Sequence, residues 1–325
     1  MAKQKTVYIC QQCGYESPKW LGKCPSCNAW NSFQEEITEG KTTGIAHKLS
    51  HGRVSPIKLN EISVEKQKRI HSGISELDRI LGGGIVPGSL ILIGGEPGIG
   101  KSTLALQLAL QISDKTTLYV SGEESEQQIR YRAERLQHLT DKCLILTETN
   151  VEEIIYHIDK VMPDIVIVDS IQTLQSEQLE SSPGTVTQIR ECTGKLQKKV
   201  KSLGIPIFLI GHINKEGNLA GPKVLEHVVD VVLQFEGDQN HFYRLLRASK
   251  NRFGSTSELG IFEMQSDGLK EVLNPSEVLI NQIDEDLSGI AIAAAIDGAR
   301  PFLIEIQSLV STDRKSTRLN SSHYS

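Results

Sequence analysis

The stretch from Ser89 to Gln111 constrains the fold most, because an apolar run, a glycine-rich loop and a helical pattern follow one another without a break. The loop reads GGEPGIGKST and carries the spacing Gly95-x4-Gly100-Lys101-Ser102. Such glycines let successive backbone N–H groups turn inward around phosphate, and the helix behind adds its positive end. We therefore expect a strand, a phosphate loop and a helix. The loop residues expected to bind the phosphates are Gly95, Glu96, Pro97, Gly98, Ile99, Gly100, Lys101, Ser102 and Thr103.

The side chains of this loop predict a nucleotide triphosphate with its metal ion. Lys101 would reach the β and γ phosphates of ATP, and the Ser102 hydroxyl would ligate Mg²⁺. The run PDIVIVDS supplies a companion acid, since Asp169 stands where a buried strand would end. We predict that Asp169 shares the Mg²⁺ shell with Ser102.

Two further strand ends carry residues suited to hydrolysis. In TLYVSGEES, Glu123 and Glu124 follow an apolar run, and one of them would orient or deprotonate the attacking water. We favour Glu123, although adjacent acids are also common on exposed turns. In FLIGHINKEG, His212 follows a third apolar run and is predicted to sense the γ-phosphate, with a purely structural histidine as the alternative.

The rest of the central segment predicts an α/β fold with a mostly parallel sheet. Short apolar runs separated by helical stretches are typical of a sheet that is buried on both faces. The strand-like runs are SLILIGG, TLYVSG, CLILTE, DIVIVDS, IPIFLIGHI and DVVLQFEG.

Four of the six cysteines lie close together near the start of the chain. Cys10, Cys13, Cys24 and Cys27 form two CxxC pairs, which offer four thiolates to a tetrahedral Zn²⁺. A redox CxxC would stand alone beside a βαβ unit, and these pairs lie outside the core. We predict a structural zinc finger, and ordinary core roles for Cys143 and Cys192.

Composition limits the class of protein. The 325 residues carry a net charge of −5, so any contact with nucleic acid has to be local. No run of about 18 apolar residues occurs, and residues 1–20 are too polar for a signal peptide. We expect a cytoplasmic protein without membrane contact.

The chain divides into segments of different character. We expect a zinc finger over 1–34, a linker over 35–56, the ATPase core over 57–274 and the opening of another domain over 275–310. Residues 311–325 change abruptly in composition and contain no apolar run. We interpret them as foreign to the protein, which would leave the last domain truncated.

Two pairs of cations are further candidates. Lys250 and Arg252 stand two apart in ASKNRFGST, so in an extended chain both would point one way, toward a shared anion. Lys215 and Lys223 flank a glycine-interrupted loop, NKEGNLAGPK, that suits contact with a DNA backbone. The alternatives are a solvated strand end and a mobile surface loop.

These pieces together resemble the bacterial RadA (Sms) family of RecA-like recombination and repair ATPases over roughly residues 5 to 310. The resemblance rests on the four-cysteine finger and on HSGISELDRILGGGIVPGSLILIGGEPGIGKST, YVSGEES, IVDSIQT, GHINKEG and KNRFG. It implies a DNA-dependent, helicase-like ATPase that forms a hexameric ring, moves on single-stranded DNA and promotes branch migration with RecA. It also implies that residues 275–310 begin a non-proteolytic domain resembling Lon protease.

The resemblance also suggests an anion for the KNRFG cations. RecA-like ATPases bind nucleotide between subunits, so Lys250 and Arg252 would stabilise the transition state in a neighbour's site. A RecA-like switch of the clock type, without DNA, remains an alternative function. A protease is excluded as a function, because GIAIAAAIDGARPFLIEIQ offers neither a candidate nucleophile nor a candidate base.

Overall fold

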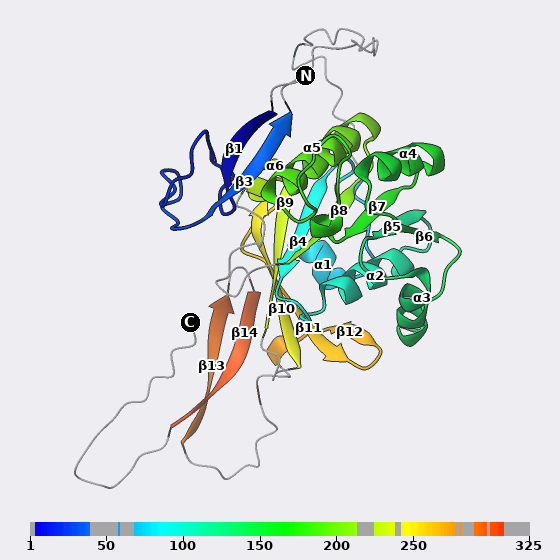
Figure 1. Cartoon of the computed structure of the whole chain (residues 1–325). Coiled ribbons are helices and arrows are strands. Elements are labelled where there is room, and N and C mark those ends of the chain that lie inside the picture. The colour runs from blue at the N-terminus through cyan, green and yellow to red at the C-terminus, as the bar shows by residue number, and fades with distance from the viewer. Residues whose placement is uncertain are drawn as a thin grey trace, which may run out of the picture. The chain divides into compact units, whose positions relative to one another are not determined.

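The computed structural model divides the chain into two compact units, Met1–Val272 and Leu273–Ser325. Figure 1 shows the whole chain. The residues that the structure describes are 4–39, 58, 68–212, 224–237, 242–276, 280, 289–297 and 300–308.

A nine-stranded sheet forms the centre of the first unit. Its strand order is β12-β11-β10-β9-β4-β8-β7-β5-β6, and the strands from β9 to β6 run parallel, whereas β10, β11 and β12 extend the sheet in antiparallel fashion. The strands are β4 (Leu90–Gly95), β5 (Thr117–Ser121), β6 (Cys143–Thr147), β7 (Ile165–Asp169), β8 (Ile207–His212), β9 (Val231–Glu236), β10 (Tyr243–Asn251), β11 (Leu259–Gln265) and β12 (Gly268–Glu271). The mostly parallel α/β sheet expected from the apolar runs is thereby confirmed.

Helices cover both faces of this sheet (Figure 1). Helices α1, α2 and α3 pack on one face, and α4, α5 and α6 pack on the other. Their bounds are α1 (Ser75–Ile80), α2 (Lys101–Gln111), α3 (Glu126–Arg135), α4 (Val151–Val161), α5 (Val186–Leu203) and α6 (Val224–Val228), with a 3-10 turn η2 (Ile171–Thr173) after β7.

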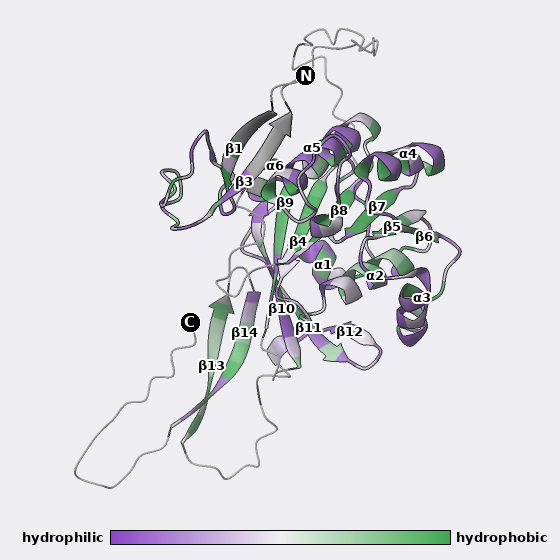
Figure 2. Ribbon diagram, in the orientation of Figure 1, coloured by the Kyte–Doolittle hydropathy of each residue, from purple (hydrophilic) through white to green (hydrophobic). Residues whose placement is uncertain are grey.

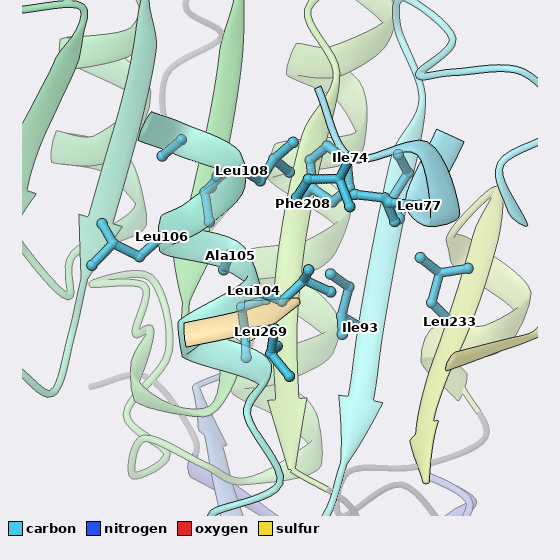
Figure 3. Close-up of a cluster of buried hydrophobic side chains, with 14 of the residues drawn as sticks. Ile74, Leu77, Ile93, Leu104, Ala105, Leu106, Leu108, Phe208, Leu233 and Leu269 are labelled. Atoms are coloured by element: carbon cyan, nitrogen blue, oxygen red, sulfur yellow. The ribbon is translucent and has the colours of Figure 1, made fainter. Parts of the chain in front are cut away.

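Burial of the sheet on both faces explains why its central strands are apolar at consecutive positions. In β4, Ile91 and Ile93 join the core under α2, whereas Leu90 and Leu92 join the core under α5. Successive side chains of a strand point to opposite faces, so a sheet covered twice needs apolar residues at both parities. Figure 2 shows the hydrophobic colouring concentrated on the central strands, and Figure 3 shows the core around α2.

The first unit also contains a small three-stranded antiparallel sheet at the start of the chain. Strands β1 (Gln4–Cys10), β2 (Glu16–Ser17) and β3 (Phe33–Glu39) lie in the order β2-β1-β3. Cys10 is the last residue of β1. The hydrophobic core of this small sheet comprises little more than Cys10, Cys24 and Phe33. A core of this size cannot stabilise a fold alone, which is why the cysteines matter here.

The second unit contains a hairpin of β13 (Ile290–Asp297) and β14 (Arg300–Gln307). Both strands lie in the segment 275–310, where the sequence predicts the opening of another domain. The proposed foreign tail at 311–325 and residues 40–56 of the predicted linker lie outside the described residues, whereas residues 35–39 of that predicted linker belong to β3. No helix in the described part of the chain is long and apolar enough to cross a bilayer.

Candidate functional site

The phosphate loop joins the end of β4 to the start of α2, as the sequence predicts. Gly98 and Gly100 adopt positive φ angles of 79° and 116°, a region that residues with a side chain rarely enter. Gly100 occupies the N-cap of α2, and no side chain caps the helix there. The first N–H groups of α2 therefore lack the usual side-chain acceptor and suit an anion.

Lys101 is held at the base of this loop. Its side chain is only 3% exposed, and its Nζ donates to the carbonyls of Gly95 and Glu96, each at 2.8 Å. Burial lowers the pKa of Lys101 to about 8, although the carboxylates of Asp169, Glu123 and Glu96 partly oppose that shift. A buried ammonium next to an open loop is thus prepared to exchange carbonyl partners for phosphate oxygens.

Asp169 closes β7, at the carboxyl edge of the sheet and beside β5 and β8. Its Oδ2 accepts a hydrogen bond of 2.7 Å from the Tyr119 hydroxyl, which comes from β5. Burial, followed by the negative charge of Asp169, raises the pKa of Tyr119 well above its usual 10. Tyr119 therefore remains a hydrogen-bond donor and fixes the orientation of the Asp169 carboxylate.

The structure distinguishes between the two neighbouring glutamates. The Ser170 hydroxyl donates to Glu123 Oε1 at 2.6 Å, and His212 Nε2 lies 3.5 Å from the same oxygen. Glu124 instead pairs with Arg132 of α3. Glu123 thus shares the carboxyl edge with Asp169, whereas the carboxylate of Glu124 is directed to a helix.

Gly122 brings Glu123 to this position. A Cβ on Gly122 would lie 2.0 Å from Thr173 Oγ1, so no larger residue fits where the chain turns past η2. The carboxyl edge therefore brings together Lys101, Asp169, Glu123 and His212, which belong to four separate sequence motifs. Ser102 and Thr103 lie in the first turn of α2 and are half-buried.

Lys250 and Arg252 lie at the opposite, amino edge of the sheet. The end of β10 pairs with the beginning of β9, and Asp230 just before β9 exchanges backbone and side-chain hydrogen bonds with Leu90, the first residue of β4. Arg252 Nη1 lies 3.3 Å from Asp230 Oδ1, while the Lys250 amino group caps carbonyls at the end of α6. Neither cation is near the phosphate loop of its own chain.

The two cations share one environment but differ in exposure. Burial, followed by the charge of Arg252, lowers the pKa of Lys250. The Arg252 side chain is 52% exposed. Asn251, between them, turns the other way and donates to the Ile80 carbonyl at 3.2 Å. Arg252 is thus the more accessible of the two.

Lys215 and Lys223 fall in residues 213–223, outside the described residues, so their contact with DNA stays a prediction.

Sequence reasoning missed several residues that build this site. Tyr119, Ser170 and Gly122 lie beside named residues but carry no motif of their own. Arg244 of β10 donates from Nε to the Ile99 carbonyl inside the phosphate loop at 3.2 Å, from 145 positions along the chain. Only the pairing of β10 with β9 brings Arg244 to this loop, and no local pattern predicts that pairing.

The four cysteines near the start of the chain converge as predicted. Their Sγ atoms all lie within 4.8 Å of one another, with 3.6 Å from Cys10 to Cys27 and 3.5 Å from Cys13 to Cys24. Four sulfurs around a tetrahedral Zn²⁺ at about 2.3 Å would be separated by about 3.8 Å. The donor set and its spacing therefore fit zinc.

The turns around the cysteines favour the same arrangement. In each CxxC, the N–H four residues after the first cysteine donates to that cysteine's carbonyl, from Gly14 and from Asn28, both at positive φ. Burial and the neighbouring thiols raise the pKa of Cys13 to about 12. Thiols this close resist joint ionisation unless a cation neutralises them, which a bound metal would do.

Two family models match the chain. Residues 55–218 match the AAA domain, and residues 8–35 match the rubredoxin metal binding domain. The first range contains the phosphate loop and strands β4 to β8, and the second contains the four cysteines.

Curated relatives match almost the whole chain. The DNA repair protein RadA of Halalkalibacterium halodurans is 50% identical over 315 residues, covering 96% of this chain and 69% of that protein. The DNA repair protein RadA of Bacillus subtilis is 49% identical over 316 residues, with the same two coverages.

Solved structures share the fold. A DnaB-like replicative helicase superposes with a TM-score of 0.56 at 16% identity, over 63% of this chain and 62% of that one. A KaiC-like protein from Pyrococcus horikoshii gives 0.52 at 21% identity, over 63% of this chain and 99% of that one. At these identities the likeness establishes a RecA-like fold and leaves the choice between helicase and switch to other observations.

Proposed function

Since this chain belongs to the family of DNA repair proteins named RadA and has a RecA-like ATPase fold, we propose that it couples ATP hydrolysis to movement on single-stranded DNA. It acts in recombinational repair and promotes branch migration of recombination intermediates together with RecA. Its partners are single-stranded and branched DNA, RecA and further copies of itself in a hexameric ring.

One observation carries the proposed hydrolysis: the phosphate loop, a buried lysine and two carboxylates meet at one edge of the sheet. Lys101 feels the charges of both Asp169 and Glu123, which come from different strands. Open α/β sheets bind their ligands at the carboxyl ends of the strands, and all these residues lie there.

The residues fit ATP with Mg²⁺. The N–H groups of the loop and the Lys101 ammonium would hold the phosphates, and Ser102 and Asp169 would hold the ion. Bound Mg²⁺ would neutralise phosphate charge as it develops in the transition state. Tyr119 keeps the Asp169 carboxylate turned in its present direction by donating to Oδ2.

Glu123 is the residue that we assign to the attacking water. Its carboxylate orients the water and accepts its proton, while the Ser170 hydroxyl holds the carboxylate at Oε1. His212, 3.5 Å from that oxygen, is placed to respond when a γ-phosphate arrives or leaves.

Lys250 and Arg252 serve a neighbouring subunit. Their position at the amino edge supports this proposal, because it removes them from their own phosphate loop and leaves the Arg252 side chain half exposed. In a ring, that edge would face the next subunit's ATP and stabilise its transition-state charge.

The remaining assignments complete the proposal. Cys10, Cys13, Cys24 and Cys27 hold a structural Zn²⁺, and Lys215 and Lys223 contact the DNA backbone.

The deciding experiment measures ATP turnover with and without single-stranded DNA at several salt concentrations, using Lys101→Ala as the inactive control. Turnover should rise on adding DNA, and the stimulation should fall as salt increases. ATP turnover that is the same with and without DNA at every salt concentration would favour a RecA-like switch of the clock type. Absence of any turnover above the Lys101→Ala background would refute the enzyme assignment.

A further inference from the structure

The antiparallel strands β10, β11 and β12 contact the phosphate loop from behind. Arg244 of β10 is only 7% exposed, and its Nε donates to the Ile99 carbonyl at 3.2 Å while its Nη1 donates to the Tyr243 carbonyl at 3.0 Å. Burying a guanidinium is costly unless its donors are satisfied, so a buried arginine in contact with a loop backbone requires a reason.

Other residues of the same strands enclose the loop and its helix. The Met264 methyl lies 2.7 Å from where a Gly100 Cβ would stand, and the two Leu269 methyl groups lie at 3.5 and 3.9 Å from that point. The Gln107 amide of α2 exchanges two hydrogen bonds with the Leu269 backbone, at 2.9 and 3.0 Å. Figure 3 shows Leu269 beside Leu104 at the start of α2. Strands β11 and β12 therefore pack directly against the phosphate loop and against α2.

The direction of the Ile99 carbonyl determines the direction of an N–H that faces the nucleotide. In a planar trans peptide the carbonyl and the next residue's N–H point in opposite directions. Arg244 holds the Ile99 carbonyl on the outer side of the loop, so the Gly100 N–H is turned inward. Gly100 has a φ of 116° and no Cβ, so its own backbone restricts the orientation of this peptide less than another residue would.

We propose that Arg244 is a positioning residue for nucleotide binding, which orients the Ile99–Gly100 peptide so that its N–H meets a phosphate. It acts on the β-phosphate region shared by ATP and ADP, and so affects affinity for both. This inference rests on the proposed function, since it presumes that the loop binds nucleotide.

The test compares binding of a fluorescent MgADP analogue by the wild-type chain and by Arg244→Met and Arg244→Lys. A hydrogen bond from a charged donor that orients a binding group is worth about 10- to 100-fold in affinity, so Arg244→Met should weaken binding by about that factor. Arg244→Lys keeps a charged donor and should recover part of the loss. A purely structural role would lower the melting temperature of the nucleotide-free protein without producing this graded order of affinities.

The matched control is Arg247→Met on the same strand, where Arg247 Nε lies 3.4 Å from Glu236 Oε2. This control should bind the analogue as the wild type does. If Arg244→Met does not fold, Arg244→Lys decides alone: affinity at least about threefold weaker, with an unchanged folded spectrum, supports the proposal. Wild-type affinity in either folded Arg244 variant overturns it. Failure of the wild type itself to bind would instead refute the proposed function.

Discussion

Replacing Arg252 and Lys101 in separate copies of the chain tests whether a neighbour completes each active site. β4 runs from Leu90 at the amino edge to Gly95 at the phosphate loop, a distance of about 17 Å at roughly 3.3 Å per residue step. Arg252 is anchored at the amino edge through Asp230, so its side chain cannot reach the γ-phosphate of its own chain. Arg252→Ala and Lys101→Ala therefore damage different halves of a shared site.

The expected losses follow from the two roles. A cation supplied by a neighbouring protein in phosphoryl transfer contributes about 10³–10⁵ in kcat, or about 4 to 7 kcal/mol. Arg252→Ala should lose turnover by a factor in that range while still binding MgADP with nearly wild-type affinity. Lys101→Ala should lose nucleotide binding at the loop and keep an intact Arg252.

Mixing the two inactive variants should restore activity. In rings assembled at random from equal amounts, about one interface in four pairs an intact loop from the Arg252 variant with an intact arginine from the Lys101 variant. We therefore expect about a quarter of wild-type turnover per mixed ring.

The assay is steady-state ATP turnover across mixing ratios, with ring formation checked by light scattering. Activity should peak near equal amounts, and adding more of either variant to itself should change nothing. The control variant Arg247→Ala, changed on the same strand, should turn over ATP without being mixed with another variant. Mixed rings that form and remain inactive would refute action between subunits, and the KNRFG cations would then serve DNA or their own subunit.

Three further outcomes are expected. Metal analysis should find about one Zn per chain, and Cys24→Ser should lose it without losing nucleotide binding; a metal-free wild type contradicts the finger. Replacing Lys215 and Lys223 together by Ala should weaken DNA binding for all sequences and flatten its salt dependence, and an unchanged salt slope would leave an ordinary surface loop. Because burial lowers the pKa of Lys101 to about 8, the free amine is increasingly neutral between pH 8 and 10.5, and binding MgADP there should take up a proton. Calorimetry in two buffers measures that uptake, which Lys101→Arg should abolish, and equal heats in both buffers for the wild type would count against a depressed pKa.

The parallel part of the sheet was predictable because its strands are short and mostly apolar, and because every one of them except β9 is followed by a helix before the next strand begins. The same rule predicted much of the site. Asp169 and His212 end apolar runs, and the carboxyl ends of parallel strands meet at one edge, so residues from different motifs had to come together. The preference for Glu123 over Glu124 gains its physical basis only from the fold, where Glu123 accepts from Ser170 and Glu124 pairs with Arg132.

The contacts that the antiparallel strands make with the phosphate loop were not predictable from the sequence. Arg244 lies in RLLRASKN, which reads as an ordinary half-buried strand, and nothing near it names Ile99 as its partner. The same limit applies to Tyr119, whose apolar neighbours predict a core residue and whose hydroxyl finds Asp169 from 50 positions away. Contacts between distant segments depend on register, which a single sequence does not encode locally.

Strand β10 joins two motifs that the sequence presents as unrelated. Arg244 near its start lies beside the phosphate loop and Lys250 near its end lies at the amino edge, because the strand runs antiparallel to β9. The strand is a single hydrogen-bonded element, so a variant at either end can displace the other. Binding of MgADP by Arg252→Ala and mixed-ring activity of Arg244→Lys are therefore the measurements that separate a direct role from a displaced strand. If each variant fails only in the assay of its own end, the two ends act independently.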